Sequence, residues 1–192
     1  MRRQLKLKQA RTARRRSTMS VEFKAWEKIP RDNPFTVTIS EKIDGTNACI
    51  IIKDDEIIGV QSKKRLITPE DDNYGFAKWV QDNNQELLSL GEGYHYGEWA
   101  GPGIQKNPLQ LERKHFFLFN TFRWNNENPN RPTCCDVVPV LYQGELTLET
   151  IPTLLENLKT KTTVREGVVV YYHTFRKYTK HTIKSPNGKW CK

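Results

Sequence analysis

A strand-like pattern that runs directly into a lysine constrains this chain most. Phe35, Val37 and Ile39 alternate with polar residues, and the pattern continues into Glu41-Lys42-Ile43-Asp44-Gly45. A period of two is typical of a half-buried strand, so Lys42 is expected at a strand end, beside a glycine that lets the backbone approach a ligand. An isolated K-x-D-G is more often a surface lysine before a tight turn. The interpretation therefore depends on the segments that follow.

The segments after Lys42 predict an antiparallel sheet flanked by helices. Residues 48–52 and 57–60 are apolar runs separated by four polar residues, which is typical of a hairpin. Thr68-Pro69-Glu70-Asp71 predicts a helix start, and residues 76, 79, 80 and 87 fall near one helical face. We expect a second helix around residues 151–158. Further strands are expected at residues 94–99, 116–122 and 167–172, with a last strand ending near Lys184.

The net charge of +9 is concentrated at the N-terminus. Residues 1–18 hold eight basic residues and no acid; because the whole chain has 31 Lys and Arg, 23 basic residues remain against 22 acidic ones. An arm this basic, without aromatic or β-branched apolar residues, is expected to be disordered by itself. It is a tail that grips nucleic acid, an Arg-rich targeting segment, or an extension upstream of a start at Met19. We favour the third interpretation, which makes residues 19–192 the folded domain.

The cysteines and histidines predict neither a disulfide framework nor a transition-metal site. The four cysteines at 49, 134, 135 and 191 lack C-x-x-C spacing, and the four histidines are scattered along the chain. No apolar run approaches the roughly 18 to 20 residues of a membrane helix. We therefore expect a soluble, monomeric, cytoplasmic protein with reduced thiols and no membrane contact.

Further segments continue the pattern begun at residues 41–47. In chain order they are Ser62-Lys63-Lys64-Arg65, His95 to Gln105, Phe116 to Asn120, Glu166 to Val170, and Ile183-Lys184. Together they resemble motifs I, Ia, III, IIIa, IV and V of the covalent nucleotidyltransferases, the superfamily of ATP-dependent ligases and mRNA capping enzymes. The sequences K-I-D-G-T-N and G-E-W-x-G-P-G-I-Q are most similar to the bacteriophage RNA ligase 2-like family.

The resemblance implies an α+β fold, an ATP-grasp-like adenylylation domain in which antiparallel sheets flanked by helices enclose the nucleotide. It also implies an ATP-dependent RNA ligase that joins RNA 5′-phosphate and 3′-hydroxyl ends. Lys42 would be the catalytic nucleophile and carry AMP as a lysyl-AMP phosphoramidate. A lysine attacks phosphorus only as the free amine, so nearby cations or a metal ion must favour loss of its proton.

The same resemblance assigns the remaining catalytic and metal-binding roles. Glu166 would be catalytic and help to hold Mg²⁺, a hard cation that prefers carboxylate and water oxygens. Lys184 would be catalytic too, neutralising charge on the α-phosphate of the bound nucleotide. Arg65 would hold a phosphate, a task suited to its fork of donors.

Further nucleotide contacts follow from the same motifs. Glu98 would accept hydrogen bonds from ribose hydroxyls, and Phe119, in preference to Phe117, would stack on adenine. Glu41, Ile43 and Asn47 complete the expected nucleotide-binding set.

The chain departs from the family pattern at two positions. Asn120 stands where family members commonly carry an acid after the stacking aromatic residue, and Thr182 stands where motif V usually has its first lysine. Lys180 could replace that lysine only if its strand were bulged.

The sequence leaves rival functions open. The chain ends eight residues after Lys184, so we expect either a minimal ligase or a fragment competent chiefly for self-adenylylation. A DNA ligase and a GTP-using capping enzyme are the nearest alternatives. A catalytically silent RNA-binding module is the alternative from another class.

Overall fold

The structure, a computed structural model, describes residue 25, residues 35–125 and residues 127–183. The chain divides into two units, Met1–Asn33 and Pro34–Lys192, and every helix and strand described below belongs to the second. The basic arm of residues 1–18 lies outside the described residues, as do Cys191 and Lys184. The boundary expected at residue 19 therefore stays a prediction.

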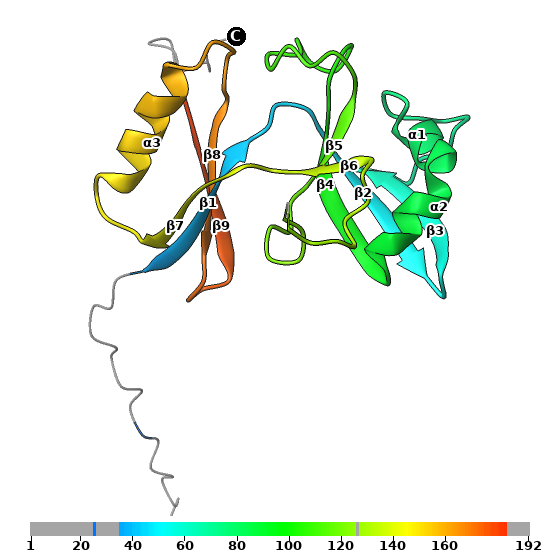
Figure 1. The fold of residues 1–192 in the computed structure, drawn as a ribbon, viewed down its shortest axis with the longest axis horizontal. Helices are drawn as coiled ribbons and strands as arrows, with labels where there is room; N and C mark the ends of the chain where they lie inside the picture. The colour runs from blue at the N-terminus through cyan, green and yellow to red at the C-terminus, as the bar shows by residue number, and fades with distance from the viewer. Residues whose placement is uncertain (1–24, 26–34, 126, 184–192) are drawn as a thin grey trace, which may run out of the picture. The chain divides into compact units, whose positions relative to one another are not determined.

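Two sheets form this second unit (Figure 1). The first sheet has the order β7 (Val140–Glu145), β1 (Thr36–Lys42), β8 (Gly167–Tyr172) and β9 (Lys177–Thr182). The second has the order β3 (Glu56–Ser62), β2 (Thr46–Lys53), β4 (Gly93–Ala100), β5 (His115–Leu118) and β6 (Cys135–Val137). Neighbouring strands are antiparallel except β5 and β6, which are parallel. The predicted α+β class with largely antiparallel sheets is confirmed.

Each sheet has its own helices and its own core. Helix α3 (Thr150–Lys159) packs through Leu158 against Val37 and Ile39 of the first sheet. Helices α1 (Phe76–Asp82) and α2 (Asn84–Leu87), followed by the short helix η1 (Leu88–Leu90), pack against the second sheet around Phe76 and Trp99 (Figure 1). Among the residues that the structure describes, no helix is long and apolar enough to cross a bilayer.

The predicted helix start at Thr68–Pro69 is wrong. Residues 68–75 form a loop, in which the Thr68 hydroxyl accepts a hydrogen bond from the Asp71 backbone at 3.2 Å. The helix begins only at Phe76, with Gly75 at its N-cap, and the carboxylate of Asp72 accepts the backbone N–H of Ala77 at 2.8 Å in the first turn. A hydroxyl three residues before an acid also favours a turn, so local chemistry alone did not separate the two outcomes.

The strand predicted at residues 116–122 is too long, and two strands were not predicted. β5 ends at Leu118, and the chain then turns, with the Trp124 backbone donating to the Asn120 carbonyl at 2.9 Å. β6 has only three residues, and β7 is an edge strand with mixed burial, so neither carries a clear alternation. The hairpin of β2 and β3, helix α3 and strand β8 are confirmed.

A third apolar cluster joins the two sheets. Its buried members are Ile43 from the turn after β1, Ala100 from the end of β4, and Val138, which precedes β7. Phe117 packs against the same cluster. This cluster packs the turn after β1 and the segment before β7 against the end of β4 and against β5.

Candidate active site

Lys42 and Glu166 form an ion pair where β1 ends and β8 begins. Lys42 pairs in register with Gly167, so the carboxylate of Glu166 lies beside the amine, and Nζ donates a hydrogen bond to Oε2. The lysine side chain is 23% exposed and the glutamate side chain 11%. The amine is thus held in place while remaining accessible from outside.

Glu98 faces this pair from the second sheet. It is 8% exposed, and the Asn47 amide donates to its Oε2 at 3.1 Å across the paired strands β2 and β4. Burial raises the pKa of the Glu98 carboxyl to about 7. The charge of Lys42 lowers it and that of Glu166 raises it, so all three side chains lie within electrostatic reach of one another.

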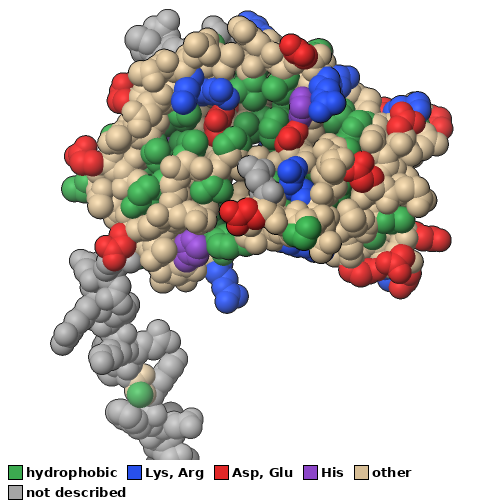
Figure 2. Space-filling view, in the orientation of Figure 1, with side chains coloured by type: hydrophobic (Ala, Val, Ile, Leu, Met, Phe, Trp, Pro, Cys, Tyr) green, Lys and Arg blue, Asp and Glu red, His purple; other side chains and the backbone are tan. Residues whose placement is uncertain are grey.

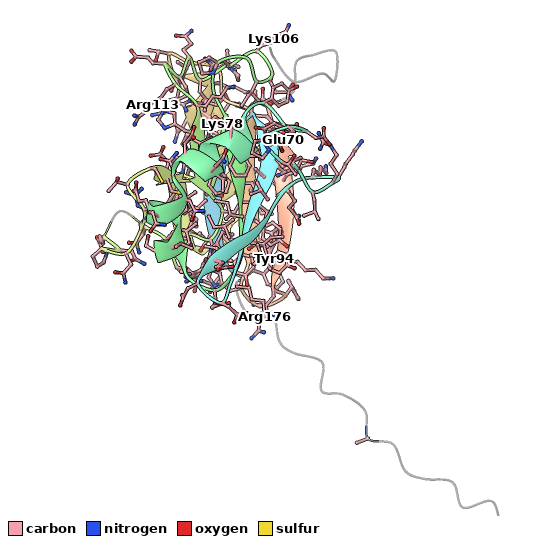
Figure 3. The ribbon with its side chains drawn as sticks, turned by 90° about the vertical axis from the view of Figure 1, so that its right-hand side faces the viewer. Glu70, Lys78, Tyr94, Lys106, Arg113 and Arg176 are labelled. Atoms are coloured by element: carbon pink, nitrogen blue, oxygen red, sulfur yellow. The ribbon has the colours of Figure 1, made fainter. Side chains whose placement is uncertain are left out.

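The turn after β1 comes close to β4 because residue 45 is a glycine. A Cβ at Gly45 would lie 2.4 Å from the Trp99 carbonyl oxygen, closer than any side chain can approach. The Gln105 amide donates to the Gly45 carbonyl at 3.4 Å, so the loop after β4 also contacts this turn. In Figure 3, Lys106 of that loop lies at one end of the fold and Tyr94 and Arg176 lie toward the other. The turn after β1 is therefore at the Lys106 end.

A pocket lies beside the Lys42 pair, between Phe119 and the first sheet. Phe119 is 38% exposed and forms one wall, while Ser40 of β1 and Val169 and Tyr171 of β8 are among the residues opposite. Phe117, in contrast, packs against the third apolar cluster. Figure 2 shows hydrophobic side chains gathered in the middle of one face, with acidic and basic side chains among them. Of the two phenylalanines, Phe119 is the one that lines the pocket.

Sequence reasoning missed Val169, Tyr171 and Tyr178 as members of this pocket. Alternation along β8 was the signal that could have found two of them. Residues 167, 169 and 171 share one face of the strand, and Gly167 pairs with Lys42 on that face. Tyr178 follows from the pairing of Tyr171 with Tyr178 on β9, which is a tertiary fact.

Two predicted nucleotide-binding residues have side chains that are already engaged elsewhere. The Glu41 carboxylate is buried and accepts a hydrogen bond from Arg165 Nη1 at 2.7 Å. The Ile43 side chain is buried in the third apolar cluster. Any nucleotide contact of these two residues must therefore come from their backbone, and it stays a prediction.

The hydrogen bonds of the Arg65 side chain link it to Asp71, and none of those described reaches Lys42 or Glu166. Its guanidinium donates to the Asp71 carboxylate at 2.6 Å and to the Asp71 backbone carbonyl at 2.9 Å. The side chain is 43% exposed. A phosphate could replace this exposed carboxylate, because both anions suit the same fork of donors. The phosphate-binding role of Arg65 stays a prediction.

The position of the first motif V lysine is filled by Thr182. β8 and β9 pair without irregularity, Gly167 with Thr182 and Val169 with Lys180. Thr182 therefore lies in the same row of the sheet as Lys42, and Lys180 lies two rows away, in the row of Ser40 and Val169. The bulge that would let Lys180 take this place is absent from the described strands. Lys184 lies outside the described residues, so its predicted role is untested.

Glu166 offers a carboxylate that suits magnesium. Within residues 35–125 and 127–183, no group of three or more His, Cys, Asp or Glu side chains converges on a possible metal position. Magnesium commonly keeps several waters and binds through one or two carboxylates together with substrate phosphates. A single accessible carboxylate beside Lys42 fits that mode.

The fold and this site together define a nucleotidyltransferase-type domain, and comparisons with known proteins agree. The RNA ligase family model matches residues 35–185. The chain therefore belongs to the RNA ligase family. No curated protein sequence matches it significantly.

Solved structures of similar fold come from Naegleria gruberi. An RNA ligase mutant without ligand has 22% identity and a TM-score of 0.57, over 78% of this chain and 50% of that one. An RNA ligase mutant with ATP and manganese has 21% identity and the same TM-score, over 78% and 49%. The ligase with pyrophosphate matches with 22% identity and a TM-score of 0.57, over 78% and 50%. The chain spans about half the length of these proteins.

Proposed function

We propose that this chain is an ATP-dependent RNA ligase that forms a covalent lysyl-AMP intermediate on Lys42. The observation that carries the proposal is the contact between the Lys42 amine and Glu166, with Glu98 buried across from them. Membership in the RNA ligase family supports RNA as the substrate. The relatives solved with ATP and manganese support ATP and a divalent cation as ligands.

The pocket beside the Lys42 pair would hold the adenosine part of ATP. The adenine ring would stack on Phe119, with Val169 on the opposite wall. Stacking of a base on an aromatic side chain contributes about 1 to 3 kcal/mol. Glu98 would bind the ribose hydroxyls, since its carboxylate is held by Asn47 on the second sheet. Base and sugar fixed in this way place the α-phosphate toward Lys42.

In the first step, the Lys42 nitrogen would form a bond to the α-phosphorus while the bond to the bridging oxygen of pyrophosphate breaks. The amine must give up a proton to react, and Glu166 Oε2 is hydrogen-bonded to Nζ and can hold that proton. Pyrophosphate takes the electron pair of the broken bond and leaves. The product is a phosphoramidate between Lys42 and AMP.

The remaining steps would transfer AMP from Lys42 to an RNA 5′-phosphate and then release it. An oxygen of the 5′-phosphate displaces Nζ from phosphorus, and a 3′-hydroxyl then displaces AMP to form the phosphodiester. Lys42 accepts a proton as it leaves, and Glu166 is placed to return it. When bound, Mg²⁺ would neutralise phosphate charge, and Glu166 is the described residue suited to hold it.

Intact mass spectrometry after incubation with ATP and Mg²⁺ tests the first step. Wild type is expected to gain the mass of AMP, and Lys42→Ala is expected to gain nothing. Lys180→Ala is the matched control, because Lys180 is an exposed lysine on β9, which is separated from β1 by β8, and it should react like wild type. If wild type and Lys42→Ala are both unmodified, the result supports the alternative of an RNA-binding module without catalysis.

Substrate choice separates the remaining alternatives. Labelling with GTP in place of ATP would indicate a capping enzyme, because that class retains GMP on its lysine. Sealing of nicked DNA in preference to nicked or single-stranded RNA would indicate a DNA ligase. Ligation of RNA ends by the wild-type chain, dependent on ATP and lost in Lys42→Ala, is the outcome expected.

A further inference from the structure

A second ion pair lies on the opposite side of the sheet from Lys42 and Glu166. Glu41 precedes Lys42, and Arg165 precedes Glu166. Because successive residues of a strand point to opposite faces, Glu41 lies on the side of Val37 and Ile39, away from Lys42. Arg165 Nη1 donates to Glu41 Oε1 at 2.7 Å. The same two chain segments are therefore joined twice, once on each side.

Packing alone does not account for this second pair. Glu41 is 6% exposed, at the end of a strand face whose other residues are aliphatic. Arg165 Nε is also buried and has no hydrogen-bond partner in the described part of the chain. Removing two charges from water is costly, and well-packed apolar residues often stabilise such a position equally well. The pair therefore suits a role in orientation better than a role in stability.

Glu166 lies in an irregular segment just before β8, where side-chain contacts can help to orient it. Residues 164–166 have no regular secondary structure between α3 and β8. Gly167 has a φ of 147°, and a Cβ there would lie 2.1 Å from the His181 carbonyl oxygen, so the chain enters β8 through a tight and unusual backbone position. The Ile183 backbone donates to the Glu166 carbonyl at 2.9 Å. These contacts fix the backbone, and the Arg165 side chain adds a link to β1.

We propose that Arg165 is a positioning residue whose ion pair with Glu41 holds Glu166 against Lys42. The proposal rests on the proposed function, because it gives Arg165 a role in the lysyl-AMP reaction. Arg165 acts through its neighbour and through β1, since its guanidinium contacts Glu41 on the side away from the pocket. When the Arg165–Glu41 ion pair is lost, Glu166 is held less firmly against Lys42. The Glu166 carboxylate then spends less time in the position that the reaction with the Lys42 amine and the binding of magnesium require.

The test compares Arg165→Met, Arg165→Lys and the double variant Glu41→Leu/Arg165→Met in the full chain. Four quantities are measured: urea stability, the rate of AMP attachment at saturating ATP, the half-saturating ATP concentration, and the half-saturating Mg²⁺ concentration. Replacing residues that orient a metal ligand typically costs roughly 10-fold to 100-fold. We expect Arg165→Met to slow AMP attachment by at least about 10-fold and to raise the Mg²⁺ requirement, with a smaller change for ATP. Arg165→Lys should recover part of the rate.

The double variant separates positioning from stability. Without a buried unpaired charge it should regain the urea stability of wild type, yet it should remain slow and demand more Mg²⁺. Arg131→Met is the matched control, because Arg131 Nε is also buried without a partner in the described residues, and its guanidinium bonds to the Cys135 carbonyl in the second sheet. This control should lose stability and keep the wild-type Mg²⁺ requirement.

Two outcomes would overturn the inference. One is a double variant that regains the wild-type rate together with stability; the other is an Arg165→Met variant with an unchanged Mg²⁺ requirement. Calorimetric titration with ATP, at several Mg²⁺ concentrations, gives a reading that needs no turnover. If wild type binds ATP but never forms the adduct, the proposed function fails, and the Mg²⁺ dependence of ATP binding in Arg165→Met still decides the positioning role.

Discussion

Replacing Glu98 by glutamine should change how the stability of the protein depends on pH. Burial raises the pKa of the folded-state carboxyl to about 7, against 4.5 for an unperturbed glutamate. Between these two values the folded protein binds more protons than the unfolded chain, so wild type loses stability as pH rises from about 4.5 to above 7. Glutamine keeps the shape and an oxygen that can accept from Asn47, but it carries no charge.

The size of the effect follows from the difference between the two pKa values. One pKa unit corresponds to about 1.4 kcal/mol, so ionising Glu98 in the folded protein costs on the order of 3 kcal/mol. Glu98→Gln should therefore be nearest to wild type at the acidic end of the range, below about pH 4.5, and exceed it by about that amount near pH 8. For a chain of this size the gain corresponds to a rise in melting temperature of roughly 5 to 10 °C.

Urea unfolding of both proteins at intervals from below pH 4.5 to pH 8, without ATP, measures the difference. Glu86→Gln is a control of opposite sign. Glu86 accepts hydrogen bonds from the Thr133 hydroxyl and the Cys134 backbone, which lower its pKa. The stability this carboxylate contributes is present above its unfolded pKa and lost as pH falls through its folded pKa, so Glu86→Gln should be the weaker protein at neutral pH. Parallel pH curves for wild type and Glu98→Gln would refute the reasoning.

Further substitutions test the pocket, the turn and the thiols. Phe119→Ala should raise the ATP concentration for half-maximal AMP attachment by roughly 5-fold to 150-fold, the equivalent of about 1 to 3 kcal/mol of stacking; Phe117→Ala should chiefly lower urea stability, and the opposite assignment of the two effects would contradict the pocket. Gly45→Ala should reduce both stability and AMP attachment, because its Cβ would lie 2.4 Å from the Trp99 carbonyl oxygen; wild-type melting and rate would show that the turn can move aside. Burial raises the pKa of the Cys49 thiol to about 11, so iodoacetamide at pH 8 should alkylate Cys49 only after denaturation, and mass mapping of native protein checks this.

Strand β1 of the first sheet could be predicted from alternation, and helix boundaries could not. The run through Phe35, Val37 and Ile39 placed Lys42 at a strand end, and β1 does end there. The helix expected at Thr68 begins at Phe76, after Gly75 at its N-cap, and the Asp72 carboxylate accepts backbone N–H groups of the first turn. Several residues between 68 and 72 can accept backbone N–H groups, and tertiary packing of Phe76 against Trp99 selects among them.

The sequence by itself determined which chemical groups this protein has and in what order they come. It also determined which face of its strand each group occupies, because the alternation of side chains is a local property of the backbone. Only the tertiary structure decided what lies opposite them. The burial of Glu98, the pocket that Phe119 lines together with residues of β1 and β8, and the pairing of Arg165 with Glu41 all depend on contacts between segments distant in the chain. Such contacts depend on how the two sheets pack and on the register in which their strands pair. Short-range sequence patterns specify neither the packing of the sheets nor the register.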